Sequence, residues 1–210
     1  MNMHLYGSFV FASLIVLMIP GPSFAYAIAV GVRNSRRVIL YNALGMALGG
    51  CAITLALAFG VAQIFASYPI AFVALKVVGC AYLFVLGVRT FFIKPQSNVL
   101  AQSEASSNPI LQGFVIETAN PKAILFYISL IPQFADPQLG HMQLQLFVLG
   151  VTFVALQVAW DIALMLGVHK LGASVTSFTS MRSQRIINRI SGATFVSLGL
   201  ILLAQERTAR

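Results

Sequence analysis

The sequence predicts an all-α integral membrane protein with six transmembrane helices, arranged as a 3+3 inverted repeat whose first and fourth helices are broken. Three observations support this. Hydrophobic residues make up 59% of the chain and charged residues 9%, against about 25% charged residues in a soluble domain. The apolar residues form runs of about 20, the length that crosses hydrocarbon. Proline interrupts two of these runs at corresponding positions in the two halves of the chain.

Six apolar segments are long enough to span a bilayer. They are roughly Leu5–Val32, Val38–Ala66, Pro69–Ile93, Pro109–Phe134, Leu144–Val168 and Ile186–Ala204. Their connections are short, so residues 1–210 are expected to form a single transmembrane domain. A Ser-, Gln- and Asn-rich linker, Gln96–Asn108, separates repeat halves of about 1–95 and 109–210. Because each half has three spans, the second half enters the membrane in the opposite sense, which makes the repeat inverted.

Small residues recur in the second span at spacings of three and four. They are Gly45, Gly49, Ala52, Ala56 and Gly60. Such a stripe lets two helix backbones approach closely in lipid, so this face is predicted to pack against another helix.

The basic residues predict the orientation. Nine of the 13 Lys and Arg residues lie in the loops that follow the odd-numbered spans: Arg33, Arg36, Arg37, Arg89, Lys94, Lys170, Arg182, Arg185 and Arg189. Loops rich in Lys and Arg stay in the cytoplasm, so both termini are predicted to be periplasmic. The same bias accounts for the net charge of +8 without a nucleic-acid partner.

A cleavable signal peptide is an alternative for the first segment, because Ala25-Tyr26-Ala27 resembles a cleavage site. The residues from Met1 to His4 include no Lys or Arg, whereas a signal peptide begins with a basic region. We therefore expect the first span to be retained.

The two interruptions are Pro20-Gly21-Pro22-Ser23 in the first span and Asn120-Pro121-Lys122 in the fourth. Proline removes a backbone donor and clashes with the preceding turn, and hydrocarbon cannot satisfy the freed carbonyl groups. Asparagine before proline is a favourable helix start. Each break is thus expected to expose a half-helix N-terminus with free N–H groups to a common cavity, where these seven residues bind a substrate carboxylate. The alternative is a pair of proline kinks lined by lipid-facing side chains.

Four ionisable residues lie inside predicted spans: Lys76, Glu117, Lys122 and Asp161. Each costs about 3 kcal/mol or more when isolated in the membrane. Lys122 lies about halfway through its span, so we expect a negative group to compensate it: a substrate carboxylate, Glu117 or Asp161. The two acids are candidates for proton coupling, and their alternative role is structural pairing with Lys122. Lys76 either belongs to this set or extends to the outer interface.

Other chemistry has less support. Cys51, Cys80 and the three histidines have no metal-ligand spacing, so no metal or other cofactor is expected. Ser23 with His169 would make a minimal pair for an intramembrane hydrolase, but the serine lacks a nucleophile-elbow pattern. We do not expect an enzyme. A channel or a scaffold for other membrane proteins is the second alternative, since broken helices also occur in pores.

The same residues resemble the LysE/RhtB family of bacterial amino-acid exporters over nearly the whole chain. The motifs are Pro20-Gly21-Pro22 followed by Leu44–Gly49; Leu75–Leu83 followed by Leu86, Gly87 and Arg89; and Asn120–Ala123 followed by Phe126 and Pro132-Gln133-Phe134. The resemblance implies a secondary active exporter of amino acids or close derivatives in the bacterial inner membrane, driven by proton antiport. It makes Lys76 part of a motif and is compatible with a homo-oligomer. Glu117 and Asp161 depart from the family pattern, and they favour a cationic substrate or a different coupling as an alternative.

Overall fold

The computed structural model describes residues 2–18, 22–61 and 108–171, with short helical pieces at 77, 81, 84–85, 87–92, 185–186, 188–190, 192–194, 196–197 and 200. All regular secondary structure in these ranges is helical, as the sequence predicts. Most of the predicted third and sixth spans lie outside the described residues, as do Lys76, Pro20 and Gly21. The main described ranges therefore cover the first, second, fourth and fifth predicted spans.

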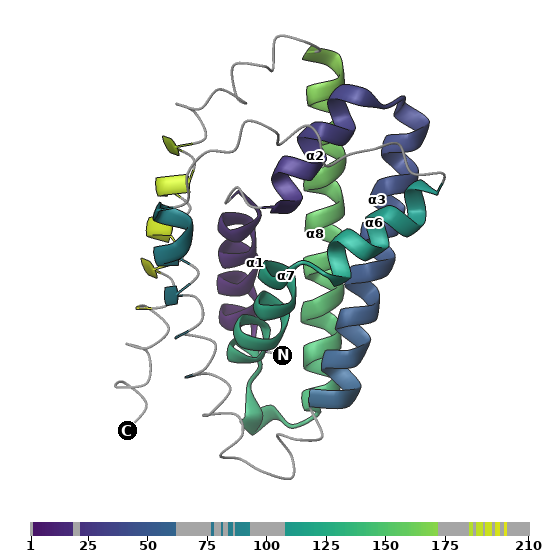
Figure 1. Ribbon diagram of the computed structural model, residues 1–210. Helices are drawn as coiled ribbons and strands as arrows, with labels where there is room; N and C mark the ends of the chain where they lie inside the picture. The colour runs from purple at the N-terminus through teal and green to yellow at the C-terminus, as the bar shows by residue number, and fades with distance from the viewer. Residues whose placement is uncertain are drawn as a thin grey trace.

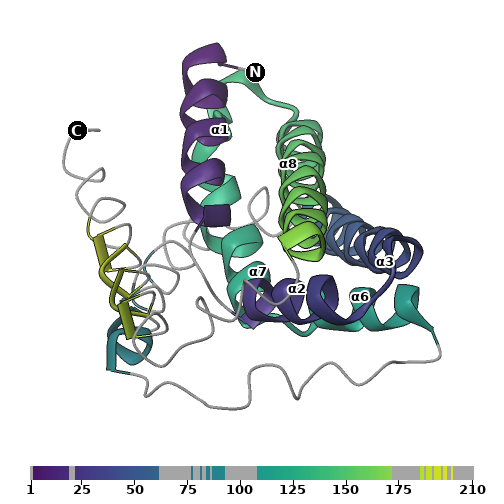
Figure 2. The same ribbon diagram turned by 90° about the horizontal axis from the view of Figure 1, so that it is seen from above.

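Two helices in the described ranges are long and apolar enough to cross a membrane. One runs over Arg36–Gly60, through α3 (Arg36–Leu55) and most of η1 (Ala56–Val61), and the other is α8 (Met142–Leu171). A third span forms if α6 (Pro109–Thr118) is joined to the helical segment Lys122–Phe134, with a bend of 56° between them. The first predicted span is divided into the apolar helix α1 (Met3–Met18) and α2 (Pro22–Arg33), which point in different directions (Figures 1 and 2).

Asparagine followed by proline begins both parts of the bent span. Asn108 caps α6 by accepting hydrogen bonds from the N–H groups of Ile110 and Leu111, each at 3.1 Å. Asn120 caps α7 (Pro121–Leu125) by accepting from the N–H of Lys122 at 3.0 Å. Proline suits the first helical position because its missing N–H would have no partner there. The predicted helix start at Asn120 is confirmed.

The described helices contain irregular turns that the sequence did not predict. Two π-helical segments occur in the described ranges, η1 at the end of α3 and η3 (Phe126–Leu130) after α7. The 3₁₀ turns η4 (Ile131–Phe134) and η5 (Pro137–Leu139) then lead to α8. Gln145 of α8 closes this end of the bundle, because its side chain bonds to the backbone of Asp136 and Gly140.

Helix α8 is the centre of the bundle: α1, α2 and α3 pack against it, and α6 packs on α3 (Figures 1 and 2). The backbones of α3 and α6 touch, since a Cβ atom added at Gly45 would overlap the backbone of Ile110. Gly49 packs on Glu117 in the same interface. The small residues of α3 and η1 were predicted to pack on another helix, and this prediction is wrong for the last three of them. They extend past the end of α6 and are exposed: Ala52, Ala56 and Gly60.

The buried apolar residues form two main clusters. The larger lies toward the start of α8 and includes Phe9, Phe126 and Phe153. The smaller lies toward the end of α2 and the start of α3, and includes Ile39 and Met165. Arg33, Arg36, Arg37 and Lys170 all belong to the helix ends that meet beyond the smaller cluster (Figure 1).

Candidate functional site

Both broken spans contribute to one small cavity of about 40 Å³ in the bundle. Its polar lining consists of Ser23, Glu117, Asn120, Lys122, Gln157 and Asp161. Its aromatic lining consists of Phe24, Phe126, Phe153 and Trp160. This volume has room for a few water molecules. An amino acid is larger, so the cavity must widen to admit one.

Asn120 connects the two breaks directly. Its side-chain amide donates to the hydroxyl of Ser23 in the first turn of α2, 97 residues earlier in the chain, while its oxygen caps α7. Sequence reasoning gave each residue a role at its own break but did not foresee this contact. The cap occupies the N–H of Lys122, so this one N–H of the half-helix start bonds to Asn120.

Lys122 points from α7 toward the end of α1. Its ammonium donates a 3.1 Å hydrogen bond to the carbonyl oxygen of Val16. The last four carbonyl groups of a helix have no partner within the helix, and the C-terminus of a helix attracts a cation. Lys122 also interacts electrostatically with Asp161 and Glu117, which face the same cavity. The end of α1 is therefore a partner that the sequence did not reveal, in addition to the two expected acids.

Glu117 and Asp161 are held around a glutamine. Glu117 is fully buried, and the side-chain amide of Gln157 donates to its Oε2 atom at 2.8 Å. Gln157 lies four residues before Asp161 on α8 and therefore on the same face of the helix. Gln157 was not among the site residues predicted from the sequence. The available signal was a polar amide one turn from an acid inside an apolar span.

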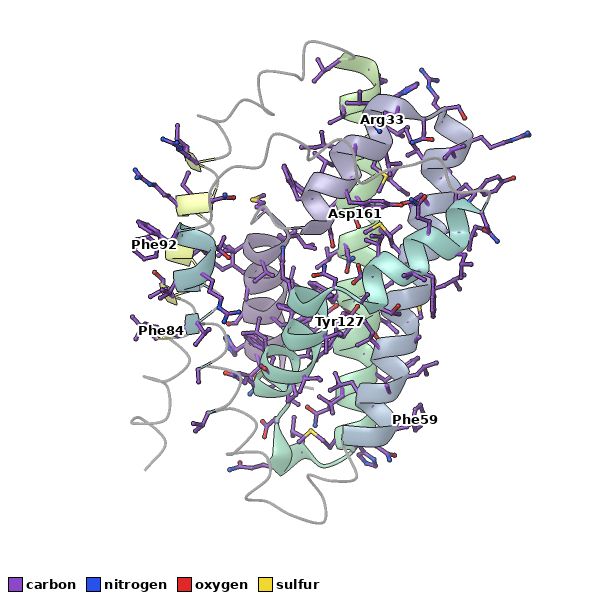
Figure 3. All side chains as sticks on the ribbon, in the orientation of Figure 1. Arg33, Phe59, Phe84, Phe92, Tyr127 and Asp161 are labelled. Carbon is purple, nitrogen blue, oxygen red and sulfur yellow. The ribbon has the colours of Figure 1, made fainter. Side chains whose placement is uncertain are left out.

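Each acid has one buried oxygen that makes no hydrogen bond to the described residues, Oε1 of Glu117 and Oδ2 of Asp161. Buried polar atoms are normally satisfied by protein or by ordered water. A proton, a water molecule or a substrate ammonium group could each satisfy these two oxygens. Figure 3 labels Asp161 in the interior of the bundle.

The other predicted site residues are placed as follows. Pro22 and Pro121 are the first residues of α2 and α7. His169 lies in the last turn of α8, about 12 Å along the helix axis from Asp161. It does not line the cavity, and the hydroxyl of Ser23 contacts Asn120. This geometry gives no support to a Ser–His pair.

Comparison with known proteins shows relatives over the whole chain. A membrane protein of Vibrio cholerae, described as uncharacterized, is 29% identical over 96% of this chain and 98% of its own length. Another uncharacterized membrane protein, from Pseudomonas aeruginosa, is 32% identical over 69% of this chain and 70% of its own length. The leucine efflux protein of Klebsiella pneumoniae is 27% identical over 91% of both chains.

No solved structure matches this chain. The sequence model of the family described as LysE type translocator matches residues 14–206. This match includes both breaks and every residue that lines the cavity, and it confirms the resemblance that the motifs indicated. The chain is therefore a multi-pass membrane protein that belongs to the LysE type translocator family.

Proposed function

We propose that this chain is a secondary active exporter of amino acids or close derivatives across the bacterial inner membrane, coupled to protons. One observation carries the proposal: two broken spans meet at a cavity that contains a lysine and two acids. Intramembrane ionisable residues that face a bundle interior mark substrate and proton pathways. The family match and the leucine efflux protein among the relatives support export of an amino acid.

The lining of the cavity complements an amino-acid zwitterion. Lys122 can pair with the carboxylate, and Asp161 can accept from the ammonium group. Phe126 and Phe153, which stack with ring centroids 4.1 Å apart, offer an apolar wall to the side chain. With both acids ionised the three charged groups sum to −1, which keeps a cationic amino acid as the alternative substrate.

The inverted repeat is part of this proposal. It rests on the matched positions of the two breaks in the two halves of the chain. The second break also contacts the first, since Asn120 bonds to Ser23 and Lys122 bonds to Val16. The basic ends of α2, α3 and α8 face the cytoplasm in the proposed orientation.

Orientation can be tested by cysteine labelling. Ser35 lies between α2 and α3 at the basic end. In intact cells, a Ser35→Cys variant should resist a membrane-impermeant maleimide and should react once the inner membrane is opened. Ser8→Cys on α1 is the comparison near the opposite end. Labelling of Ser35→Cys in intact cells would contradict the proposed orientation and place this end of the bundle in the periplasm.

Transport by purified protein in liposomes tests the function. Vesicles loaded with one unlabelled amino acid should accumulate the same labelled amino acid by counterflow, and an imposed pH gradient should accelerate this uptake. The screen should include leucine, phenylalanine, lysine and arginine. A channel would equilibrate the label without overshoot, and an inert protein would match empty liposomes, so either result would contradict an exporter.

A further inference from the structure

Three buried oxygen atoms lie along α3, at its contacts with α6, η3 and α8. They are Oε1 of Glu117, the hydroxyl of Tyr127 and the hydroxyl of Thr54. Glu117 and Tyr127 are 0% exposed and Thr54 is 1% exposed. None of the three atoms makes a hydrogen bond of ordinary geometry to the described residues, but the side chain of Thr54 interacts with the hydroxyl of Tyr127. Of the three residues, only Glu117 lines the cavity.

The three side chains follow one another along α3. Glu117 packs on Gly49, where an added Cβ would lie 2.9 Å from the Cβ of the glutamate. The hydroxyl of Tyr127 lies over the next residue, Gly50, at 2.9 Å from the corresponding position. Thr54 lies one helical turn further along α3. Along the axis of α3 the order is therefore Glu117, Tyr127 and Thr54, and we call their three oxygens the row. Tyr127 also interacts electrostatically with Glu117.

Two glycines leave space for this row because they have no side chain. A Cβ at Gly50 would press on the hydroxyl of Tyr127, and a Cβ at Gly150 of α8 would lie 2.7 Å from the hydroxyl of Thr54. Both π-helical segments also occur here, because η3 contains Tyr127 and η1 begins two residues after Thr54. Single π-helical turns within α-helices are frequent at functional sites.

From this arrangement we infer that Tyr127 and Thr54 carry protons between Glu117 and the outer side of the membrane. The inference rests on the proposed proton-coupled exporter and adds a route for its protons. In the proposed orientation, Thr54 lies on the outer side of Tyr127, and Tyr127 lies on the outer side of Glu117. In Figure 3, Tyr127 lies further than Asp161 from the basic end marked by Arg33.

The transfer step conserves protons. Tyr127 gives its hydroxyl proton to a bridging water, which gives one of its own protons to Oε1 of Glu117, because the two side chains make no direct hydrogen bond. The oxygen of Tyr127 accepts a proton from the hydroxyl of Thr54 or from water, and Thr54 is reprotonated by water from the outer side. No bond other than O–H bonds forms or breaks. Glu117 is flanked by Lys122 of α7 and Asp161 of α8, and Tyr127 is flanked by Glu117 and Cys51 of α3. Glu117 is thus the end of the row nearest the substrate cavity.

Tyr127→Phe is the direct test, because it removes one hydroxyl and keeps the ring that packs edge-on against Phe126 and Phe153. Substrate exchange at equal pH on both sides of the liposome should remain at the wild-type rate. Uptake driven by a pH gradient should fall about tenfold or more, since a positioned proton-transfer group contributes about 10²–10⁴-fold. Tyr6→Phe is the matched control, because it also removes one tyrosine hydroxyl, but that hydroxyl bonds to Thr152 at the α1–α8 contact and is not part of the row.

A second pair of variants covers the case in which Tyr127→Phe does not fold. Thr54→Val removes the hydroxyl at nearly constant shape and should also lose the pH-driven component, whereas Thr54→Ser should restore it. Unchanged pH-driven uptake in both Tyr127→Phe and Thr54→Val would overturn the route, while wild-type transport would still support the exporter. A wild-type protein that exchanges substrate but responds to a sodium gradient instead of a pH gradient would also overturn the route. Absence of any exchange by the wild-type protein would instead overturn the proposed function.

Discussion

The ammonium group of Lys122 donates a 3.1 Å hydrogen bond to the carbonyl oxygen of Val16, 106 residues earlier in the chain. This bond connects the second break to the end of α1, where the carbonyl groups lack helical partners. A substrate carboxylate that takes the Lys122 donor now bound to Val16 would release this carbonyl oxygen. In the proposed exporter, substrate binding can therefore loosen α1 from α7, which would help to widen a cavity of about 40 Å³.

We predict that Lys122→Met raises the substrate concentration for half-maximal counterflow by about tenfold or more, because a charge-assisted hydrogen bond contributes about 1.5–3 kcal/mol. The carbonyl of Val16 also loses a donor in this variant. Lys170→Met is the control, since Lys170 is exposed in the last turn of α8. An unchanged half-saturation concentration would remove Lys122 from substrate binding.

The contact between Asn120 and Ser23 should be measurable as a coupling between the two broken spans. Asn120→Ala removes the cap of α7, which costs about 1 kcal/mol, and it also removes the donor to Ser23. A double-mutant cycle with Ser23→Ala should give a coupling energy of about 0.5–1.5 kcal/mol in the free energy of unfolding in detergent. Asn120→Ser keeps a capping hydroxyl but is too short to replace the amide at Ser23. If Ser23→Ala destabilises Asn120→Ala as much as it destabilises the wild type, the contact contributes nothing.

The close approach of α3 and α6 makes Gly45 sensitive to substitution. A methyl group there would overlap the backbone of Ile110, and rigid backbone cannot move aside as a flexible side chain can. We expect Gly45→Ala to lower the free energy of unfolding by about 1–3 kcal/mol. Gly7→Ala is the control, because an added Cβ at Gly7 meets nothing within 4 Å and alanine favours a helix by up to about 1 kcal/mol. Equal stability of the two variants would contradict the packing.

Local rules made the breaks predictable from the sequence. Proline cannot continue a helix without cost, and asparagine before proline is a strong start signal, so the helix start at Asn120 could be read directly. The start of α3 and both bounds of α8 followed from their apolar runs within three residues, whereas α3 gives way to the π-helical segment η1 after Leu55, before the predicted end of its span. These features depend on residues close together in the chain.

Contacts between distant segments could not be read in this way. The partnership of Lys122 with Val16 uses a backbone carbonyl, which every residue carries and no sequence pattern marks. The amide of Gln157 looks like any polar residue until α6 brings Glu117 against it. The exposure of Ala52 similarly depends on where α6 ends, and the stripe of small residues alone could not show that.

The last prediction concerns Glu117, where the substrate cavity and the row of buried oxygens meet. Its carboxyl group accepts from Gln157 at one oxygen and leaves the other for a proton. Glu117→Gln has nearly the same shape as the protonated acid but can neither gain nor lose a proton. Substrate exchange should therefore remain measurable in this variant, while acceleration by a pH gradient should disappear. Asp136→Asn is the control, because Asp136 lies in the loop before α8 and outside the cavity. Persistence of pH-driven uptake in Glu117→Gln, together with its loss in Asp161→Asn, would move the coupling role to Asp161 and leave Glu117 as a structural partner of Lys122.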